Sequence, residues 1–257
     1  MLGYDFLWAE AEHSTASPES IERLIIAAER RGMPSLVRVG YGYQKVIGHL
    51  QKYLTSGATG IILPQCETAE DAQLVVEAVK FPPLGRRGLA GDRWNSWGLH
   101  ESNNDHNIHN NNLNHSSSSL IRNHNGLSMK ERVEEENKTS ICGVMIESKR
   151  GLNNLEEILQ VPHLDFISFG PTDISCDLGY HGQYAHPEVS ALIEKAGERI
   201  LESGLATGTL ILNQEEYEYW RARGFTIMCC VAQSMFVNGA SNFKQEMDSY
   251  EKKRAEK

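Results

Sequence analysis

The chain has 257 residues, 40% of them hydrophobic, a length that suits one large α/β barrel or two ordinary domains. It carries 25 Lys and Arg against 34 Asp and Glu, and this formal charge of -9 argues against nucleic-acid binding because an acidic surface repels phosphate backbones. No signal-like N-terminus and no apolar run of the ~18 residues that cross a bilayer is visible, and the five sparse cysteines are typical of reduced thiols. The composition predicts a soluble cytoplasmic protein with neither a nucleic-acid nor a membrane partner.

Short apolar runs rich in β-branched residues alternate along the chain with segments of helical periodicity. Most runs are too continuously apolar to face water on either side, which is typical of a parallel sheet covered by helices. Helix start signals at Ser17-Pro18, Thr68 and His186-Pro187 lie between them. This alternation predicts an α/β fold of (β/α)8 TIM-barrel type with seven strands, one fewer than the closed barrel. The predicted strands are 6–11, 35–39, 60–65, 141–147, 166–171, 206–212 and 226–232.

Residues 100–126 interrupt this pattern with nine Asn, five Ser and five His and hardly any apolar side chain. Such a tract cannot bury enough surface to offset the entropy of ordering it, so it is predicted to be a disordered low-complexity insertion. Its histidines could bind a metal, but compositional drift in a polar loop is strongly favoured as their explanation. The rest of the chain, residues 1–257 with this insertion inside it, is predicted to be one barrel domain.

Polar residues follow the predicted strands at the edge where the active sites of α/β barrels lie. Taken singly, each could be a loop cap or a structural ion-pair partner. Together, two or more carboxylates, an imidazole and a guanidinium at one end of a sheet suit a hard divalent cation with open positions for substrate and water. These residues are Glu10, Glu12 and His13 after the first strand, Arg38 on the second, Glu147 after the fourth and Asp173 after the fifth.

Glycine-rich turns give a second signal. Gly170-Pro171 follows a strand and lets backbone N–H groups approach an anion such as a substrate carboxylate. Gly85-Arg86-Arg87-Gly88 could hold an acidic group or be a tight surface turn, and the sequence does not favour either. Residues 92–95, directly after this turn, are the candidate for a specificity loop.

In this order, the motifs resemble the metal-dependent (class II) pyruvate aldolases of the HpcH/HpaI family of hydroxy-oxo-acid aldolases. The resemblance covers most of the chain outside the insertion and the charged C-terminal tail, and the combination of its motifs is specific. The matching motifs are Gly3-Tyr4-Asp5 through Glu12-His13, Val37-Arg38, Ile62-Leu63-Pro64, Pro82-Pro83-Leu84-Gly85-Arg86-Arg87-Gly88, Val144-Met145-Ile146-Glu147, Gly170-Pro171-Thr172-Asp173 and His186-Pro187-Glu188.

The resemblance implies a role for each of these residues. Glu147 and Asp173 would bind Mg2+, Mn2+ or Co2+, and pyruvate would chelate the ion so that its methyl protons become more acidic. His13 would act as general base, with Glu10 and Arg38 beside it in the catalytic set and Arg38 stabilising the enolate. Substrate contacts would come from the residues Gly170, Pro171, Thr172 and Met145, the last standing where some members use a Gln.

The implied reaction is reversible cleavage of a 4-hydroxy-2-oxo acid into pyruvate and an aldehyde through a metal-bound enolate. The small-molecule partners would thus be a keto acid and an aldehyde. The resemblance also implies a homo-oligomer that exchanges a C-terminal helix, for which residues 235–253 are the candidate.

Two departures from the family pattern keep other functions open. Family members normally have a strand and helix before the Gly-Tyr-Asp segment, and that unit would be the eighth strand. Thr55 stands where many members place an Asp that makes the active-site His more basic through a subunit interface. A truncated, catalytically weak or inactive relative that binds metal and keto acid, or acts as a partner subunit, is the alternative. A decarboxylase or a carbon–carbon lyase of another substrate class is a further possibility.

Overall fold

The computed structural model of the protein describes residues 3–40, 46–98 and 127–255, so the predicted insertion at 100–126 lies outside the described residues. The predicted seven-stranded parallel sheet is confirmed. Each strand ends before its predicted C-terminal boundary, because the chain leaves the sheet to form the turns that carry the polar residues. The strands are β1 (Leu7–Glu10), β2 (Ser35–Arg38), β3 (Gly60–Leu63), β4 (Ile141–Ile146), β5 (Phe166–Phe169), β6 (Ala206–Leu210) and β7 (Ile227–Cys229).

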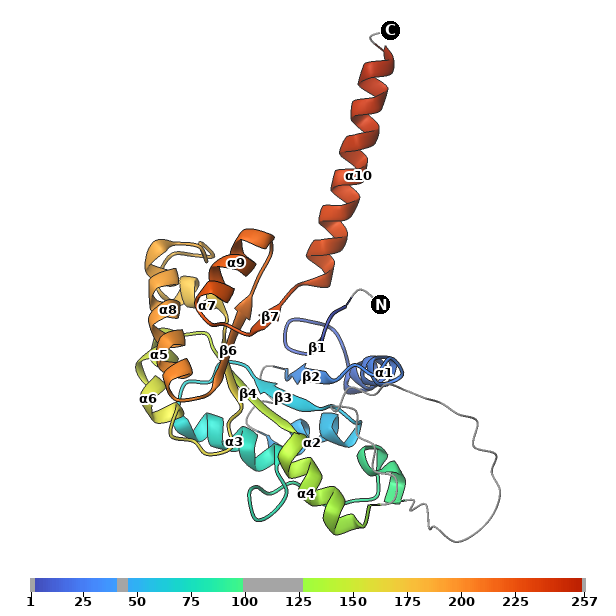
Figure 1. The fold of residues 1–257 in the computed structure, drawn as a ribbon, viewed down its shortest axis with the longest axis vertical. Helices are drawn as coiled ribbons and strands as arrows, with labels where there is room; N and C mark the ends of the chain where they lie inside the picture. The colour runs from blue at the N-terminus through green and yellow to red at the C-terminus, as the bar shows by residue number, and fades with distance from the viewer. Residues whose placement is uncertain (1–2, 41–45, 99–126, 256–257) are drawn as a thin grey trace, which may run out of the picture.

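The strands follow one another in sequence order, and every neighbouring pair is parallel. The sheet curls into a nearly closed barrel whose free edges are β1 and β7 (Figure 1). Because all strands run the same way, their carboxyl ends meet at one mouth. The register sets Glu10 of β1 directly beside Arg38 of β2, which places two of the predicted site residues at the same level.

Helices cover the outside of the sheet, and several begin at the predicted signals. The Ser17 side chain accepts the N–H of Ser20, and Thr68 forms a reciprocal capping box with Asp71. The helices are α1 (Pro18–Glu29), α2 (Ile47–Thr55), α3 (Ala69–Val79), η1 (Arg93–Gly98), α4 (Met129–Thr139), α5 (Lys149–Asn153), α6 (Leu155–Ile158), α7 (Pro171–Asp177), α8 (Pro187–Glu202), α9 (Gln214–Ala222) and α10 (Ala232–Ala255).

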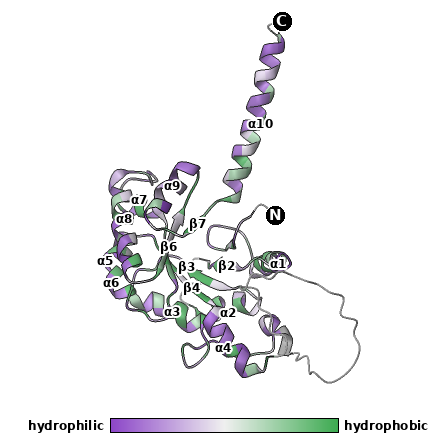
Figure 2. Ribbon diagram, viewed as in Figure 1, coloured by the Kyte–Doolittle hydropathy of each residue, from purple (hydrophilic) through white to green (hydrophobic). Residues whose placement is uncertain are grey.

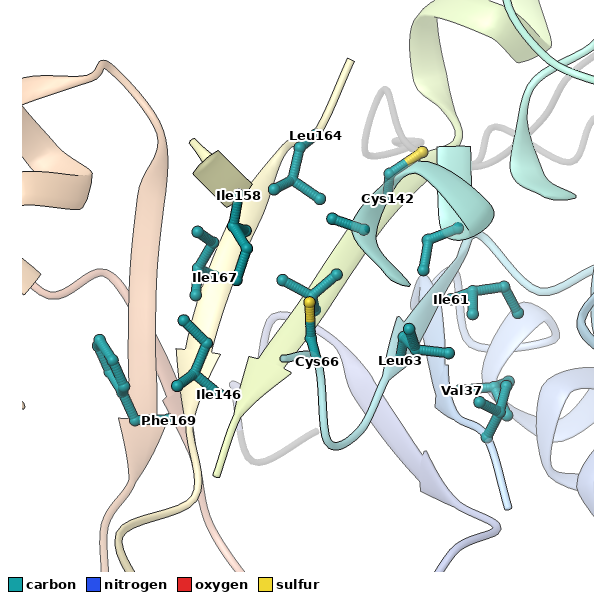
Figure 3. Packing of buried hydrophobic residues seen from close by; sticks show 14 of the residues in the cluster. Val37, Ile61, Leu63, Cys66, Cys142, Ile146, Ile158, Leu164, Ile167 and Phe169 are labelled. Atoms are coloured by element: carbon teal, nitrogen blue, oxygen red, sulfur yellow. The ribbon is translucent and has the colours of Figure 1, made fainter. Parts of the chain in front are cut away.

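Alternation of side chains along the strands divides the core into two layers. Strand residues such as Val37, Ile61 and Ile167 face outward and pack with helix residues such as Ile158 in the larger cluster, part of which is shown in Figure 3. The inner layer is small, with a core formed by Leu36, Ile62, Met145 and Phe166. The same alternation that sends these residues inward also sends Arg38 and Glu147 into the mouth.

A second group of buried charged residues lies at the opposite end of the barrel, where helices return to strands. Arg87 pairs with Glu136 at 3.0 Å and lies over the rings of Phe81 and Trp94, its Cζ atom 4.6 and 5.1 Å from their centroids. The guanidinium of Arg132 donates to the carbonyls of Asn95 and Leu127 at 2.8 and 3.0 Å. We call Arg87, Glu136 and Arg132, with the groups that they contact, the amino-end cluster.

The amino-end cluster decides two expectations from the sequence. Arg87 is buried and paired with Glu136 of the same chain, so for this residue neither a surface turn nor a site for an acidic ligand holds. The expectation of a specificity loop at residues 92–95 is wrong. Arg93 pairs with Glu29 at the end of α1 and lies 3.3 Å from the position that a Cβ would take at Gly57, just before β3. A helix-to-strand connection lies at the amino ends of the strands, away from the mouth.

Helix α10 differs from the others because it extends away from the barrel (Figure 1). It spans 24 residues, and none of them is buried. Hydrophilic and hydrophobic residues are mixed along it (Figure 2). Among the described residues, no helix, α10 included, is both long and apolar enough to cross a membrane.

A candidate active site at the carboxyl end of the barrel

Arg38 lies at the centre of the charged residues in the mouth. Its Nε and Nη2 atoms are both 2.7 Å from Oε2 of Glu10, and its Nη1 is 3.1 Å from Oε2 of Glu12 and 3.7 Å from Oε1 of Glu147. Burial alone would lower the pKa of Arg38, but the surrounding carboxylates raise it overall. The guanidinium is therefore a fixed cation, and Sδ of Met145 lies 3.5 Å from its Nη1.

Glu10 orients Arg38 and also shapes the turn after β1. Its Oε1 atom accepts the backbone N–H groups of Glu12 and His13 at 2.6 and 2.8 Å. Its Oε2 atom contacts Nε and Nη2 of Arg38. Both oxygens of the carboxylate are thus occupied by protein groups, so Glu10 acts by holding Arg38 and the turn that carries His13.

Glu12 also belongs to the site, although no role was predicted for it from the sequence. Its side chain is only 1% exposed, and burial raises its pKa, an effect that Arg38 and His13 oppose. Within the described residues, no hydrogen bond reaches Oε2, although Arg38 lies close. The available signal was the strand period, because residues 8, 10 and 12 alternate onto the same inner face.

Glu147 is buried at the end of β4 and held from two sides. The backbone N–H of Gln65 donates to its Oε2 at 2.7 Å. On the other side, a Cβ at Gly170 would lie 2.7 Å from its Oε1, so only glycine leaves room for this carboxyl. Burial and the charge of Glu12 raise the pKa of Glu147 to about 8. The protein alone therefore compensates the negative charge of this carboxylate poorly.

Asp173 stands in the first turn of α7, exposed at the mouth. Its charge contributes to the raised pKa of both Glu12 and Glu147, so the three carboxylates act on a common region. Pro171 is the first residue of α7 and Thr172 is exposed beside it. The N–H of Gly170 donates to the carbonyl of Ile146 at 3.1 Å and is already used in the sheet.

His13 lies at the rim of the mouth, with its side chain 61% exposed. Its Nε2 atom is 3.7 Å from Oε2 of Glu12, so a carboxylate that is also near Arg38 lies beside the imidazole. Thr55 is at the other end of the barrel, where its hydroxyl hydrogen-bonds to Asp92. A contact between His13 and Thr55 would therefore have to cross from one subunit to another.

The mouth has the ligand chemistry of a hard cation but not a complete ligand shell. Across residues 3–40, 46–98 and 127–255, no three His, Cys, Asp or Glu side chains are arranged so that they could hold a metal ion. Two carboxylates, Glu147 and Asp173, fit a site whose other ligands come from substrate and water. One guanidinium is shared by Glu10, Glu12 and Glu147, and this excess of carboxylates favours a cation there.

Comparison with known proteins identifies the family. The model of the HpcH/HpaI aldolase/citrate lyase family matches residues 1–236. The chain belongs to this family. The predicted family and the predicted class of enzyme, an aldolase that breaks carbon–carbon bonds, are confirmed.

Two relatives within the HpcH/HpaI family have aldolase names. A hydroxypyruvate/pyruvate aldolase of Roseobacter denitrificans is 33% identical over 208 residues, which are 81% of this chain and 70% of the relative. A 2-keto-3-deoxy-L-rhamnonate aldolase of Escherichia coli K12 is 28% identical over 240 residues, 93% of this chain and 78% of the relative.

Solved structures support the fold. An HpcH/HpaI aldolase/citrate lyase family protein of Burkholderia cenocepacia superposes with a TM-score of 0.78 at 23% identity, covering 96% of this chain and 86% of the other. An HpcH/HpaI aldolase of Desulfitobacterium hafniense gives 0.74 at 25% identity, with 95% and 83% covered. The barrel predicted from the sequence is that of the HpcH/HpaI proteins.

Proposed function

We propose that this enzyme is a divalent-metal-dependent pyruvate aldolase that reversibly cleaves a 4-hydroxy-2-oxo acid into pyruvate and an aldehyde. The observation that carries the proposal is the imbalance of charge in the mouth, where one guanidinium faces the carboxylates of Glu10, Glu12 and Glu147. An oxo acid bound together with a cation fits this arrangement. The names of the relatives, a pyruvate aldolase and a 2-keto-3-deoxy acid aldolase, point to the same class of substrate.

Glu147 and Asp173 are the residues that would hold the cation, and Mg2+, Mn2+ and Co2+ all suit two carboxylates completed by oxygen ligands. The bound ion would act as a Lewis acid toward the oxygens of the oxo acid and make the carbon next to the keto group more acidic. The protein's part is to hold Glu147 so that one oxygen faces the mouth, which Gln65 and Gly170 do from opposite sides.

Arg38 stabilises the negative charge that develops on the keto oxygen as the carbon–carbon bond breaks. Its position is fixed before substrate binds, because Glu10 holds Nε and Nη2 and leaves Nη1 directed toward Glu12 and Glu147. A prefixed guanidinium needs no reorganisation during the reaction. Nη1 of Arg38 also donates to Sδ of Met145 at 3.5 Å, which places Met145 beside the substrate, and Gly170, Pro171 and Thr172 would form the wall for the substrate carboxylate.

His13 is the general base and acts through water. In cleavage it accepts the proton of the 4-hydroxyl group, and in synthesis it accepts a methyl proton of pyruvate. The exposure of its imidazole ring at the rim gives water access, and Oε2 of Glu12 lies 3.7 Å from its Nε2. The carboxylate beside this base thus belongs to the same subunit.

The test is a pyruvate-release assay on a 4-hydroxy-2-oxo acid with enzyme stripped by a chelator. Stripped enzyme should be inactive, and added Mn2+ should restore turnover. Glu147→Gln keeps the shape of the side chain but removes the charge, and it should remain inactive with Mn2+. Full turnover in stripped enzyme or in Glu147→Gln contradicts the proposal. Thermal stabilisation by Mn2+ and pyruvate without turnover would instead identify an inactive binding relative.

The proposal includes a homo-oligomer formed through α10. This helix presents large apolar side chains to solvent, with Phe236 77%, Phe243 64% and Tyr250 65% exposed. A helix with this much exposed apolar surface is typical of one that packs on a second copy of the chain. Light scattering of the full chain should give a mass above the 28.8 kDa of one chain. A monomer at assay concentration contradicts this part of the proposal.

A further inference from the structure

The loop between β3 and α3 is fastened to the turn that carries Glu147. The N–H of Cys66 donates to the carbonyl of Met145 at 2.9 Å, just before Glu147 in the sequence. Ser148 donates to Oε1 of Glu67 at 2.8 Å, and Asn154 donates to the carbonyl of Glu67 at the same distance. Three bonds within two residues fix the backbone of this loop relative to the end of β4.

Gln65 lies in this loop in an unusual backbone conformation. Its φ is 52°, in the left-handed region that residues with a Cβ rarely adopt. In this conformation its N–H points to Oε2 of Glu147 at 2.7 Å. Its exposed side chain extends over the mouth, and Nε2 lies 3.4 Å from Oε1 of Glu12. The strained residue thus contacts two of the three carboxylates of the region.

This contact determines which oxygen of Glu147 is available. Oε2 is occupied by the N–H of Gln65, whereas Oε1 lies toward Arg38 at 3.7 Å and against the backbone of Gly170. A carboxylate held by one charge-assisted hydrogen bond has one oxygen left in a defined place. Groups that orient a metal ligand in this way commonly influence affinity as strongly as ligands do.

We propose that Gln65 is a positioning residue of the aldolase, which uses its left-handed backbone to aim Oε1 of Glu147 at the cation. The inference rests on the proposed function, in which Glu147 holds that cation. Gln65 itself touches neither the cation nor the substrate in this role. Its side chain is secondary. A residue that keeps the backbone conformation but has no side-chain amide should therefore orient Glu147 equally well.

The test compares two substitutions at Gln65 with a matched control. Gln65→Val places a β-branched residue where φ is positive and should displace the N–H, whereas Gln65→Gly favours this conformation and should keep it. His163 is also exposed and left-handed, with a φ of 64°, but it lies in the loop before β5. His163→Val therefore introduces the same backbone strain away from Glu147.

The readouts are the Mn2+ dissociation constant from titration calorimetry and kcat for pyruvate release. Gln65→Val should weaken Mn2+ binding about tenfold or more and lower kcat, as expected for loss of a group that orients a ligand. Gln65→Gly and His163→Val should bind Mn2+ within about twofold of the wild type. Wild-type affinity in Gln65→Val, or equal loss in His163→Val, overturns the inference while leaving the cation site intact. A wild type that binds no Mn2+ overturns the cation site and this inference together.

Hydrogen exchange gives a second measurement that does not depend on whether Gln65→Val folds. In the wild type the amide proton of Gln65 is bonded to Glu147, so Glu147→Ala should accelerate its exchange about tenfold or more relative to the amide of Cys66. Equal protection of the Gln65 amide in both proteins would show that the bond does not exist and would overturn the inference.

Discussion

At each end of the barrel charged residues surround an arginine, and the two groups differ in their balance of charge. At the amino end, Arg87 is 4% exposed, pairs with Glu136 and lies over two aromatic rings. At the carboxyl end, Arg38 faces three carboxylates, one of which, Glu147, has its pKa raised to about 8. In a balanced pair the two charges neutralise each other, and the pair has a structural role. An acidic excess favours protonation or a bound cation, and in the proposed function this imbalance marks the active site.

The largest effect is expected from Arg38→Met. Loss of the guanidinium that contacts Glu10, Glu12 and Glu147 should lower kcat/KM about a thousandfold or more. The carboxylates left behind should also make Mn2+ more stabilising in thermal melts than it is for the wild type. Arg38→Lys keeps the charge but cannot bind Glu10 through two nitrogens, so its kcat/KM should lie between those of the wild type and Arg38→Met. Turnover near the wild-type value in Arg38→Met would remove Arg38 from the mechanism.

Arg87→Met tests the other side of the comparison. Removing one member of a buried pair should cost about 3–5 kcal/mol of unfolding free energy. Turnover per folded molecule and the Mn2+ dissociation constant should stay at wild-type values, because the amino-end cluster does not contact the mouth. Chemical denaturation combined with the pyruvate assay checks both points. A change in Mn2+ affinity would show that the two ends are coupled.

The double variant Arg87→Met/Glu136→Leu sharpens the same comparison. Replacing both charges of a buried pair by apolar residues should recover much of the stability that Arg87→Met loses. The matched double variant Arg38→Met/Glu10→Leu should recover stability in the same way but no turnover. Recovery of turnover in that variant would mean that the charges at the mouth are structural, as they are at the amino end.

Gly170→Ala should have a smaller effect. The added Cβ would lie 2.7 Å from Oε1 and 2.8 Å from Cγ of Glu147, so this side chain must shift. We expect Mn2+ affinity to fall about tenfold, because the displaced carboxylate of Glu147 can still bind a cation but no longer lies in the right position. Calorimetric titration measures this, and Gly88→Ala, where a Cβ would meet nothing within 4 Å, is the control. Unchanged affinity in Gly170→Ala would place the cation elsewhere.

The sequence could predict the strands and most of the mouth because both follow from simple periodicities. Continuous apolar runs predicted seven parallel strands, and the rule that barrel sites lie at carboxyl ends selected Glu10, Arg38 and Glu147. The strand ends were overestimated, since apolar residues such as Val39 continue beyond the last residue of the strand. The same rule would have excluded residues 92–95, had the connection been recognised as one that runs from helix to strand.

Glu12 and Gln65 show what could not be predicted. In Glu10-Ala11-Glu12-His13, either glutamate could serve Arg38, and only the fold shows that Glu10 holds two of its nitrogens while Glu12 faces the third. Gln65 acts through a backbone N–H, which every residue but proline possesses. A main-chain contribution of this kind is set by a dihedral angle and leaves no signature in the choice of side chain.

Arg132 has a consequence for how this protein can vary in length. One guanidinium binds the carbonyls of Asn95 and Leu127, so the two stretches of chain on either side of residues 99–126 are held next to each other. With the exit and re-entry points fixed, lengthening the connection between them costs little, because closure entropy grows only with the logarithm of loop length. The barrel can therefore accept long additions at this point without any change in the geometry of its mouth.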